Sequence, residues 1–177
     1  MLLYLSLIDS EEDKSKFERL YLAYKQQMYY AANRILKDSH LAEDAVHQAF
    51  LRIIDNLEKI NENECHKTKG FVVIIVEHVA IDFYNRRKKE NAVSWEENEY
   101  VLEDMEKKDF TKGGIEALLL ELPVNYSSVL RLKYAHGYEN QEIAKILRIT
   151  EENVRQRILR GRKFLEKLMS EGGIREV

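Results

Sequence analysis

The chain has 177 residues, with 28 Lys plus Arg, 31 Asp plus Glu and a single Cys. One cysteine can neither close an internal disulfide nor supply several thiolates to zinc, which excludes a stapled secreted scaffold and a zinc finger. The longest apolar run, Phe71 to Val76, is six residues, whereas a membrane span needs roughly 20. We therefore expect a cytoplasmic protein with no membrane insertion.

The net charge of −3 is unevenly distributed along the chain. Residues 91–112 carry seven acidic and three basic side chains, whereas residues 131–169 carry ten basic and five acidic ones. An acidic stretch without apolar periodicity is typical of a solvated linker, and a basic block indicates a surface that faces a polyanion. With only one Pro and seven Gly, the chain is predicted to be all-α. We expect two small helical domains, 1–90 and 113–177, joined by a flexible acidic linker at 91–112.

Two amphipathic helices are predicted in the first half. From Lys16 to Lys37, apolar residues recur with the spacing of one buried helix face, and aromatic residues at such spacing are core residues more often than base-stacking platforms. The same pattern continues after Ser39, which is predicted to be the N-cap of the second helix. The opposite, polar face of that helix carries Glu43, Asp44, His47, Gln48 and Arg52.

The segment from Thr68 to Lys89 carries conflicting signals. Five consecutive β-branched residues, Val72 to Val76, favour a strand, while the length of the segment and a cap at Thr68 favour a helix. Two aromatics, Phe83 and Tyr84, then precede four consecutive cations. This combination suits base stacking and phosphate neutralisation, but this run by itself favours a solvated basic helix end.

The last third indicates a helix-turn-helix. A packing helix is predicted to begin near Pro123 and to stop at Gly137, followed by a short helix from Gln141 to Leu147. The connection ends at Thr150, the predicted N-cap of the final helix.

The final helix is predicted to have two chemically different faces. One face is apolar, while the rest of the surface carries most of the seven cations found between Arg148 and Lys167. Arg and Gln side chains on a helix in the major groove can hydrogen-bond guanine and adenine, and the remaining cations can hold phosphates. A solvated basic helix without a ligand and a protein-binding helix-turn-helix are the alternatives.

Catalytic and metal-binding patterns are not evident. The sequence has no P-loop, nucleophile elbow or HExxH motif, and the neighbouring Glu43 and Asp44 do not face each other on a helix. Cys65 and His66 alone do not make a tetrahedral site. We therefore expect no enzyme activity, no metal and no cofactor.

Three segments together resemble the sigma-70 family of RNA polymerase sigma factors, in its extracytoplasmic-function (ECF) group. The run from Leu41 to Leu51 (LAEDAVHQAFL) is similar to conserved region 2, and Phe71 to Lys89 is similar to the helix that melts and recognises the promoter. Residues from Leu122 to Leu168 are similar to region 4. The resemblance covers about residues 15–90 and 114–170. It implies an all-helical region 2 and therefore a helix at 68–89.

The resemblance also implies roles for particular residues. In region 2 it implies polymerase contacts, in the clamp of the largest subunit, for Asp44, His47, Gln48 and Leu51. The loop from Asn61 to Gly70 corresponds to the segment that captures an unstacked base. Contacts with the melted −10 element are implied for His78, Asp82, Tyr84, Arg86, Arg87 and Lys88. His78 is a base-reading residue by this comparison, whereas a lone histidine on an apolar helix is otherwise a core residue.

In region 4, the resemblance implies that the −35 element is contacted by Arg155, Gln156, Leu159 and Arg160. Phosphate contacts are implied for Arg157, Arg162 and Lys163. The chain carries Arg148 and Glu152 where the family usually has glycine.

The implied function is promoter-specific transcription initiation, with core RNA polymerase and duplex and melted promoter DNA as partners. Sigma factors of this group are often held by an anti-sigma factor, although no residue specifies one here. Two other hypotheses are a free-standing helix-turn-helix regulator that acts without polymerase and a protein-interaction module. A free-standing regulator has no need for the polar face around Asp44 or for the aromatic and basic end of the 68–89 segment.

Overall fold

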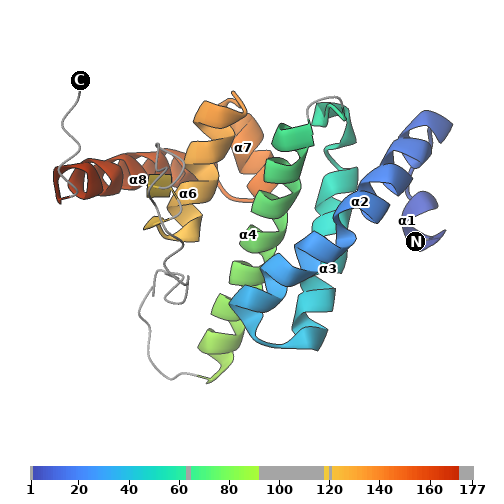
Figure 1. Ribbon diagram of the computed structural model, residues 1–177, viewed down its shortest axis with the longest axis horizontal. Helices are drawn as coiled ribbons and strands as arrows, with labels where there is room; N and C mark the ends of the chain where they lie inside the picture. The colour runs from blue at the N-terminus through green and yellow to red at the C-terminus, as the bar shows by residue number, and fades with distance from the viewer. Residues whose placement is uncertain (1, 63–64, 92–117, 120, 172–177) are drawn as a thin grey trace. The chain divides into compact units, whose positions relative to one another are not determined.

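The computed structural model describes residues 2–62, 65–91, 118–119 and 121–171, and every regular element in these ranges is helical (Figure 1). This confirms the predicted all-α fold. The chain divides into two compact units, Met1–Glu96 and Glu97–Val177. Apart from Asn91, the predicted linker at 91–112 lies outside the described residues. Within those ranges, no helix has the length and apolarity needed to cross a membrane.

Three long helices build the first unit. They are α2 (Glu11–Leu36), α3 (Ser39–Ile54) and α4 (Cys65–Asn91), and each packs against the other two. The short helix α1 (Leu2–Leu5) and the 3-10 turn η1 (Leu57–Lys59) complete the unit. Phe17, Phe50 and Phe71, one from each long helix, are among the largest fully buried side chains. Tyr21 packs against Phe50 with ring centroids 4.8 Å apart, as expected for a core residue.

Helix caps explain where α2 and α3 begin. Ser10 caps α2, its hydroxyl accepting a hydrogen bond from the Asp13 backbone N–H at 3.4 Å, so the helix starts earlier than the predicted Lys16. The N-cap of α3 is Asp38, and the prediction of Ser39 was wrong by one residue. The Asp38 carboxylate accepts from the backbone N–H groups of both His40 and Leu41 at 3.1 Å. A carboxylate accepts two bonds and also suits the positive end of the helix dipole, so it outcompetes a neutral hydroxyl.

The β-branched run in α4 is helical, as the resemblance implied. Val72, Ile74, Ile75 and Val76 are all fully buried. Burying such a side chain contributes about 1.5–3 kcal/mol, which exceeds the few tenths of a kcal/mol by which a β-branched residue disfavours a helix. Thr68 lies inside the helix, where its hydroxyl donates to the Asn61 carbonyl oxygen at 2.8 Å, so the predicted cap at Thr68 was wrong.

The second unit contains the predicted helix-turn-helix. It consists of α6 (Val124–Leu130), the π-helical segment η2 (Arg131–Ala135), α7 (Asn140–Leu147) and α8 (Glu151–Glu171). Gly137 has a φ of 77° and follows the end of η2, which confirms the predicted stop. The Thr150 hydroxyl accepts from the Asn153 N–H at 3.1 Å, which confirms the predicted cap of α8.

The turn between α7 and α8 depends on a left-handed arginine. Arg148 has a φ of 55°, a conformation that costs a non-glycine residue roughly 1–2 kcal/mol. Its backbone N–H donates to the Lys145 carbonyl at 3.3 Å, and the Ile149 N–H donates to the Ala144 carbonyl at 3.0 Å. These bonds satisfy carbonyls at the end of α7 and hold the short turn without a glycine.

A small core fixes α8 in the second unit. Leu122, Tyr126 and Leu130 pack against the partly buried Ile158, Leu165 and Leu168 of α8. Gly161 of α8 is buried at this contact. A Cβ atom there would lie 2.9 Å from Leu130 Cδ1 and 3.2 Å from Tyr126 Cβ. A Cβ atom here would force Leu130 and Tyr126 to shift, so the close approach of α6 and α8 favours glycine at this position.

We expect Gly161→Leu to destabilise the second unit by about 1–3 kcal/mol, since the added side chain must push α6 away from α8. The free energy of unfolding, followed by far-ultraviolet circular dichroism in urea, measures the effect. Lys163→Leu is the matched control, because Lys163 lies on the same helix and is exposed. Equal stability of the two variants would contradict the proposed tight contact.

Candidate nucleic-acid and polymerase interface

The outer surface of α8 presents most of the side chains predicted to contact duplex DNA. Arg155, Gln156, Leu159, Arg160, Arg162 and Lys163 are exposed, and Arg157 is half-buried. The opposite face packs in the core of the unit, where Val154 is fully buried. The core therefore fixes which face of α8 is available for a ligand, as the two-faced pattern predicted.

Two of the predicted base-contacting side chains are held by carboxylates in the first turn of α8. Arg155 Nη2 lies 2.6 Å from Glu151 Oε1, and Arg155 Nη1 lies 3.4 Å from Glu152 Oε2. Gln156 Nε2 donates to Glu152 Oε1 at 3.3 Å. By contrast, none of the residues that the structure describes forms an ion pair with Arg160, Arg162 or Lys163. These three side chains can meet an anion without first releasing an internal partner.

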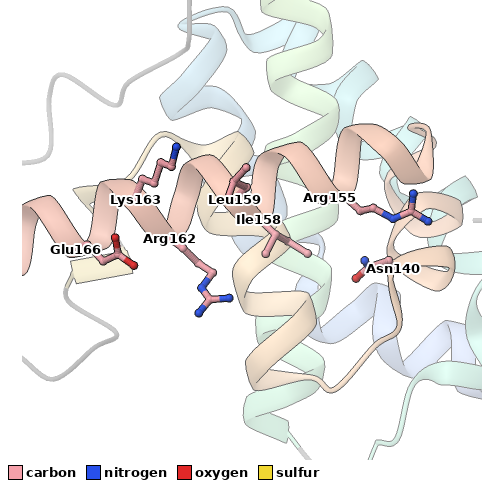
Figure 2. A pocket seen from close by; sticks show the side chains of 7 residues that line it. All are labelled: Asn140, Arg155, Ile158, Leu159, Arg162, Lys163 and Glu166. Carbon is pink, nitrogen blue, oxygen red and sulfur yellow. The ribbon is translucent and has the colours of Figure 1, made fainter.

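A shallow groove runs along α8 beside these cations. Its volume is about 330 Å³, and Figure 2 shows Arg155 and Asn140 at one end and Lys163 and Glu166 toward the other. The apolar side chains of Ile158 and Leu159 line it between the cations. Four of the residues predicted to contact DNA thus border one groove, where cations can hold phosphates and apolar atoms can contact a base or sugar.

The polar face predicted on α3 is formed except at Arg52, which is buried. Asp44 and His47 are exposed, Gln48 and Leu51 are half-buried, and their spacing places them on one side of the helix. The hydroxyl of Tyr4 lies 2.6 Å from His47 Nδ1. Burial and the nearby Tyr21 raise the pKa of Tyr4 to about 12, so the hydroxyl remains protonated at neutral pH. The sequence patterns gave no indication of this contact, since it joins residues distant in the chain.

His78 lies in the core of the first unit. Its side chain is only 1% exposed, and its Nδ1 lies 3.5 Å from Arg52 Nη1 and 3.5 Å from Asp82 Oδ2. A base cannot reach a ring in this position, so of the two interpretations of His78 the geometry fits the core residue.

Asp82 is held by Arg52, which sequence periodicity had placed on the polar face of α3 but which is buried. Arg52 is 8% exposed, and its Nη2 lies 3.0 Å from Asp82 Oδ2. Burial alone would raise the pKa of Asp82, but the hydrogen bonds and positive charges of His78 and Arg52 lower it overall. The carboxylate therefore ties α4 to α3, and its role as a DNA contact would be secondary to this ion pair.

The C-terminal part of α4 carries the aromatic and basic residues predicted to contact melted DNA. Arg86, Arg87 and Lys88 are exposed, and Tyr84 is half-buried. The Arg86 guanidinium lies 5.8 Å from the centroid of the Phe83 ring, and Arg87 Nη1 lies 3.4 Å from Asp38 Oδ2. Exposed cations beside aromatic rings form a surface suited to a single-stranded polyanion.

Together these features define a two-module helical protein, with a helix-turn-helix in one module and an aromatic, basic helix end in the other. Two family models match the chain: "Sigma-70 region 2" at residues 20–90 and "Sigma-70, region 4" at residues 112–165. The chain belongs to the sigma-70 family of RNA polymerase sigma factors, in its ECF group.

Two relatives and one solved structure are similar to the chain over most of its length. The ECF RNA polymerase sigma factor SigX of Bacillus subtilis is 26% identical over 163 residues, covering 86% of this chain and 83% of that protein. SigM of the same organism is 25% identical over 159 residues, covering 88% of this chain and 96% of that protein. Among solved structures, the sigma factor RpoE of Bartonella quintana, in complex with the anti-sigma factor NepR, covers 88% of this chain and 97% of that chain, with 17% identity and a TM-score of 0.39.

The Arg52–Asp82 pair can be tested by Asp82→Asn, which removes the carboxylate and leaves a buried guanidinium with a weaker partner. We expect a loss of about 1–3 kcal/mol in the free energy of unfolding at neutral pH, toward the lower end because the 40% exposure of Asp82 allows solvent screening.

The pH dependence of that loss has a definite sign. The folded-state pKa of Asp82 is lowered, so the pair stabilises the fold above the unfolded pKa of about 3.9, and this stabilisation disappears as pH falls through the folded-state pKa. Urea unfolding of both proteins at several pH values measures this. A difference that grew on acidification would contradict the assignment.

Proposed function

We propose that the chain positions core RNA polymerase at particular promoters and that its two units contact different parts of the promoter. The first unit docks on polymerase and holds the melted strand of the −10 element, and the second unit recognises the duplex −35 element. The observation that carries this proposal is the occurrence of region 2 and region 4, in that order, in one chain. A free-standing helix-turn-helix regulator has no use for the first of these.

In the second unit, α8 would enter the major groove of duplex DNA. Arg155, Gln156, Leu159 and Arg160 are proposed to meet base edges, while Arg157, Arg162 and Lys163 hold phosphates. An arginine can donate two hydrogen bonds to the O6 and N7 atoms of guanine. Because Glu151 and Glu152 already hold Arg155, Arg160 is the side chain best placed to make such a contact without losing an internal ion pair.

In the first unit, the end of α4 would hold unpaired DNA. Arg86, Arg87 and Lys88 are proposed to neutralise phosphates, and Tyr84 to stack on an exposed base. Unstacking a base costs a few kcal/mol per step. Contacts available only to the melted strand offset that cost, so binding favours the open promoter.

The exposed side of α3 would contact the polymerase. The residues of this side, Asp44, His47, Gln48 and Leu51, combine an acidic group, hydrogen-bonding groups and apolar surface, as protein interfaces commonly do.

We also propose that an anti-sigma factor regulates the chain by covering the surfaces that bind polymerase or DNA. The polymerase would supply the chemistry of nucleotide addition, in the cytoplasm, and this chain would supply the positioning.

The proposed function is tested by adding purified protein to core RNA polymerase and a library of promoter fragments, and by mapping the transcripts. We expect transcripts that begin at a fixed distance from a shared pair of sequence elements and that require both proteins. Binding to duplex DNA without polymerase association would instead support a free-standing regulator.

Arg160→Ala tests the recognition of a base by α8. If Arg160 contacts a base, the variant should lose about 1–3 kcal/mol of affinity for the preferred −35 sequence and should discriminate less at one position. Quantitative DNA binding to single-base variants of the element measures this. Arg162→Ala is the matched control, because loss of a phosphate contact weakens binding about equally on all sequences. Uniform loss for Arg160→Ala as well would make it a phosphate contact.

A further inference from the structure

The short helix α1 is anchored in the core of the first unit. It lies outside residues 20–90, the range matched by the region 2 family model. Tyr4 is buried, and its ring centroid lies 5.3 Å from that of Phe17 and 5.8 Å from that of Phe50. Figure 1 shows α1 alongside the N-terminal part of α2. The helix is therefore a packed part of the unit.

Tyr4 also joins α1 to the proposed polymerase-binding face of α3. Its hydroxyl lies 2.6 Å from His47 Nδ1, and the two ring centroids are 5.2 Å apart. His47 shares one side of α3 with Asp44 and Leu51. Because His47 itself is exposed, α1 borders this face without covering it.

Next to this contact, α1 and the turn after it expose two leucines. Leu3 is 65% exposed and Leu7 is 56% exposed, whereas Ile8 is buried like Tyr4. The backbone that carries them is ordered by hydrogen bonds: the Ser6 hydroxyl donates to the Leu3 carbonyl at 2.7 Å, and the Leu7 N–H donates to the Tyr4 carbonyl at 3.0 Å. Two leucines presented on a fixed backbone leave apolar surface in water that a partner can bury.

The hydrogen bond with Tyr4 also affects which ring nitrogen of His47 can donate a hydrogen bond to a partner. The Tyr4 hydroxyl remains protonated at neutral pH because its pKa is raised to about 12. In the neutral tautomer that carries its ring proton on Nε2, the Nδ1 atom of His47 accepts a hydrogen bond from this hydroxyl. In that tautomer, Nε2 of His47 can act as a hydrogen-bond donor beside the acidic Asp44.

We propose that α1 extends the polymerase-docking face of α3, with Leu3 and Leu7 burying apolar surface against core RNA polymerase and Tyr4 orienting His47 toward the same partner. This proposal rests on the proposed role of α3. Polymerase is the favoured occupant because Leu3 adjoins Tyr4 in the chain, and Tyr4 contacts His47 on the acidic and polar face that would bind it. An interface of this kind combines an apolar contact with a polar one, and the two are buried together.

The experiment compares equilibrium affinities of variants for core RNA polymerase, with any affinity tag placed at the C-terminus. We expect the double variant Leu3→Ser, Leu7→Ser to bind about tenfold or more weakly, because both apolar contacts are lost. Tyr4→Phe, which keeps the packed ring, should bind about three- to tenfold more weakly. Leu22→Ser is the matched control, since Leu22 is 75% exposed on α2, and it should bind normally.

Thermal unfolding establishes that the variants are folded, which is expected because the leucines are exposed and Tyr4→Phe retains the ring. Unchanged affinity of the double variant and of Tyr4→Phe would overturn the proposal. Tighter binding would also overturn it, since α1 would then mask the face. Loss of a dimer in analytical ultracentrifugation, with polymerase binding intact, would assign the leucines to a second copy of the chain.

Asp44→Arg distinguishes failure of this proposal from failure of the proposed function. If Asp44→Arg abolishes polymerase binding while the α1 variants bind normally, α3 is the docking face and only the role of α1 is wrong. If Asp44→Arg also binds normally, the role assigned to α3 is wrong as well. Duplex DNA binding through α8 should be unaffected in all of these variants.

Discussion

The burial of α4 between α2 and α3 is the constraint on which the first unit depends. Four of the five residues of its β-branched run are fully buried, and the packing of α4 against both helices fixes its register and its direction. Further along α4, Asp82 forms an ion pair with Arg52 of α3, which adds a polar contact between the two helices. The aromatic and basic residues that follow are then carried into solvent on a rigid support. A flexible segment with the same composition would present those cations at a greater entropic cost.

The second unit also presents its cations on a helix that is held by packing, but its core is smaller. Its core is small, and Gly161 lets α8 approach α6 closely enough for that core to hold the helix. The Thr150 cap fixes the start of α8, and the left-handed Arg148 fixes the turn that leads into it. Packing on one side of α8 therefore leaves its cations on the other. The carboxylates of Glu151 and Glu152 hold the Arg155 side chain through ion pairs.

Much of the fold and of the candidate site could be predicted from the sequence. Periodicity predicted α2, α3 and the faces of α8, and the capping chemistry of Thr150 and the stop at Gly137 were correct. Local patterns failed where two adjacent residues could both cap, as at Asp38 and Ser39. They also failed at Thr68, whose hydroxyl is used by a distant carbonyl. The cations of α8 and of the end of α4 were predictable as surface residues because charge is costly to bury.

By itself, the sequence determined the helical class, the two-unit organisation of its motifs and the chemistry of the exposed faces, because these follow from residue type and spacing. Only the tertiary structure decided which of those groups are available to a partner. It placed His78 in the core beside Arg52 and Asp82, and it brought Tyr4 to His47 across 43 positions in the chain. Such contacts arise from helix packing between distant segments, and no local pattern encodes them.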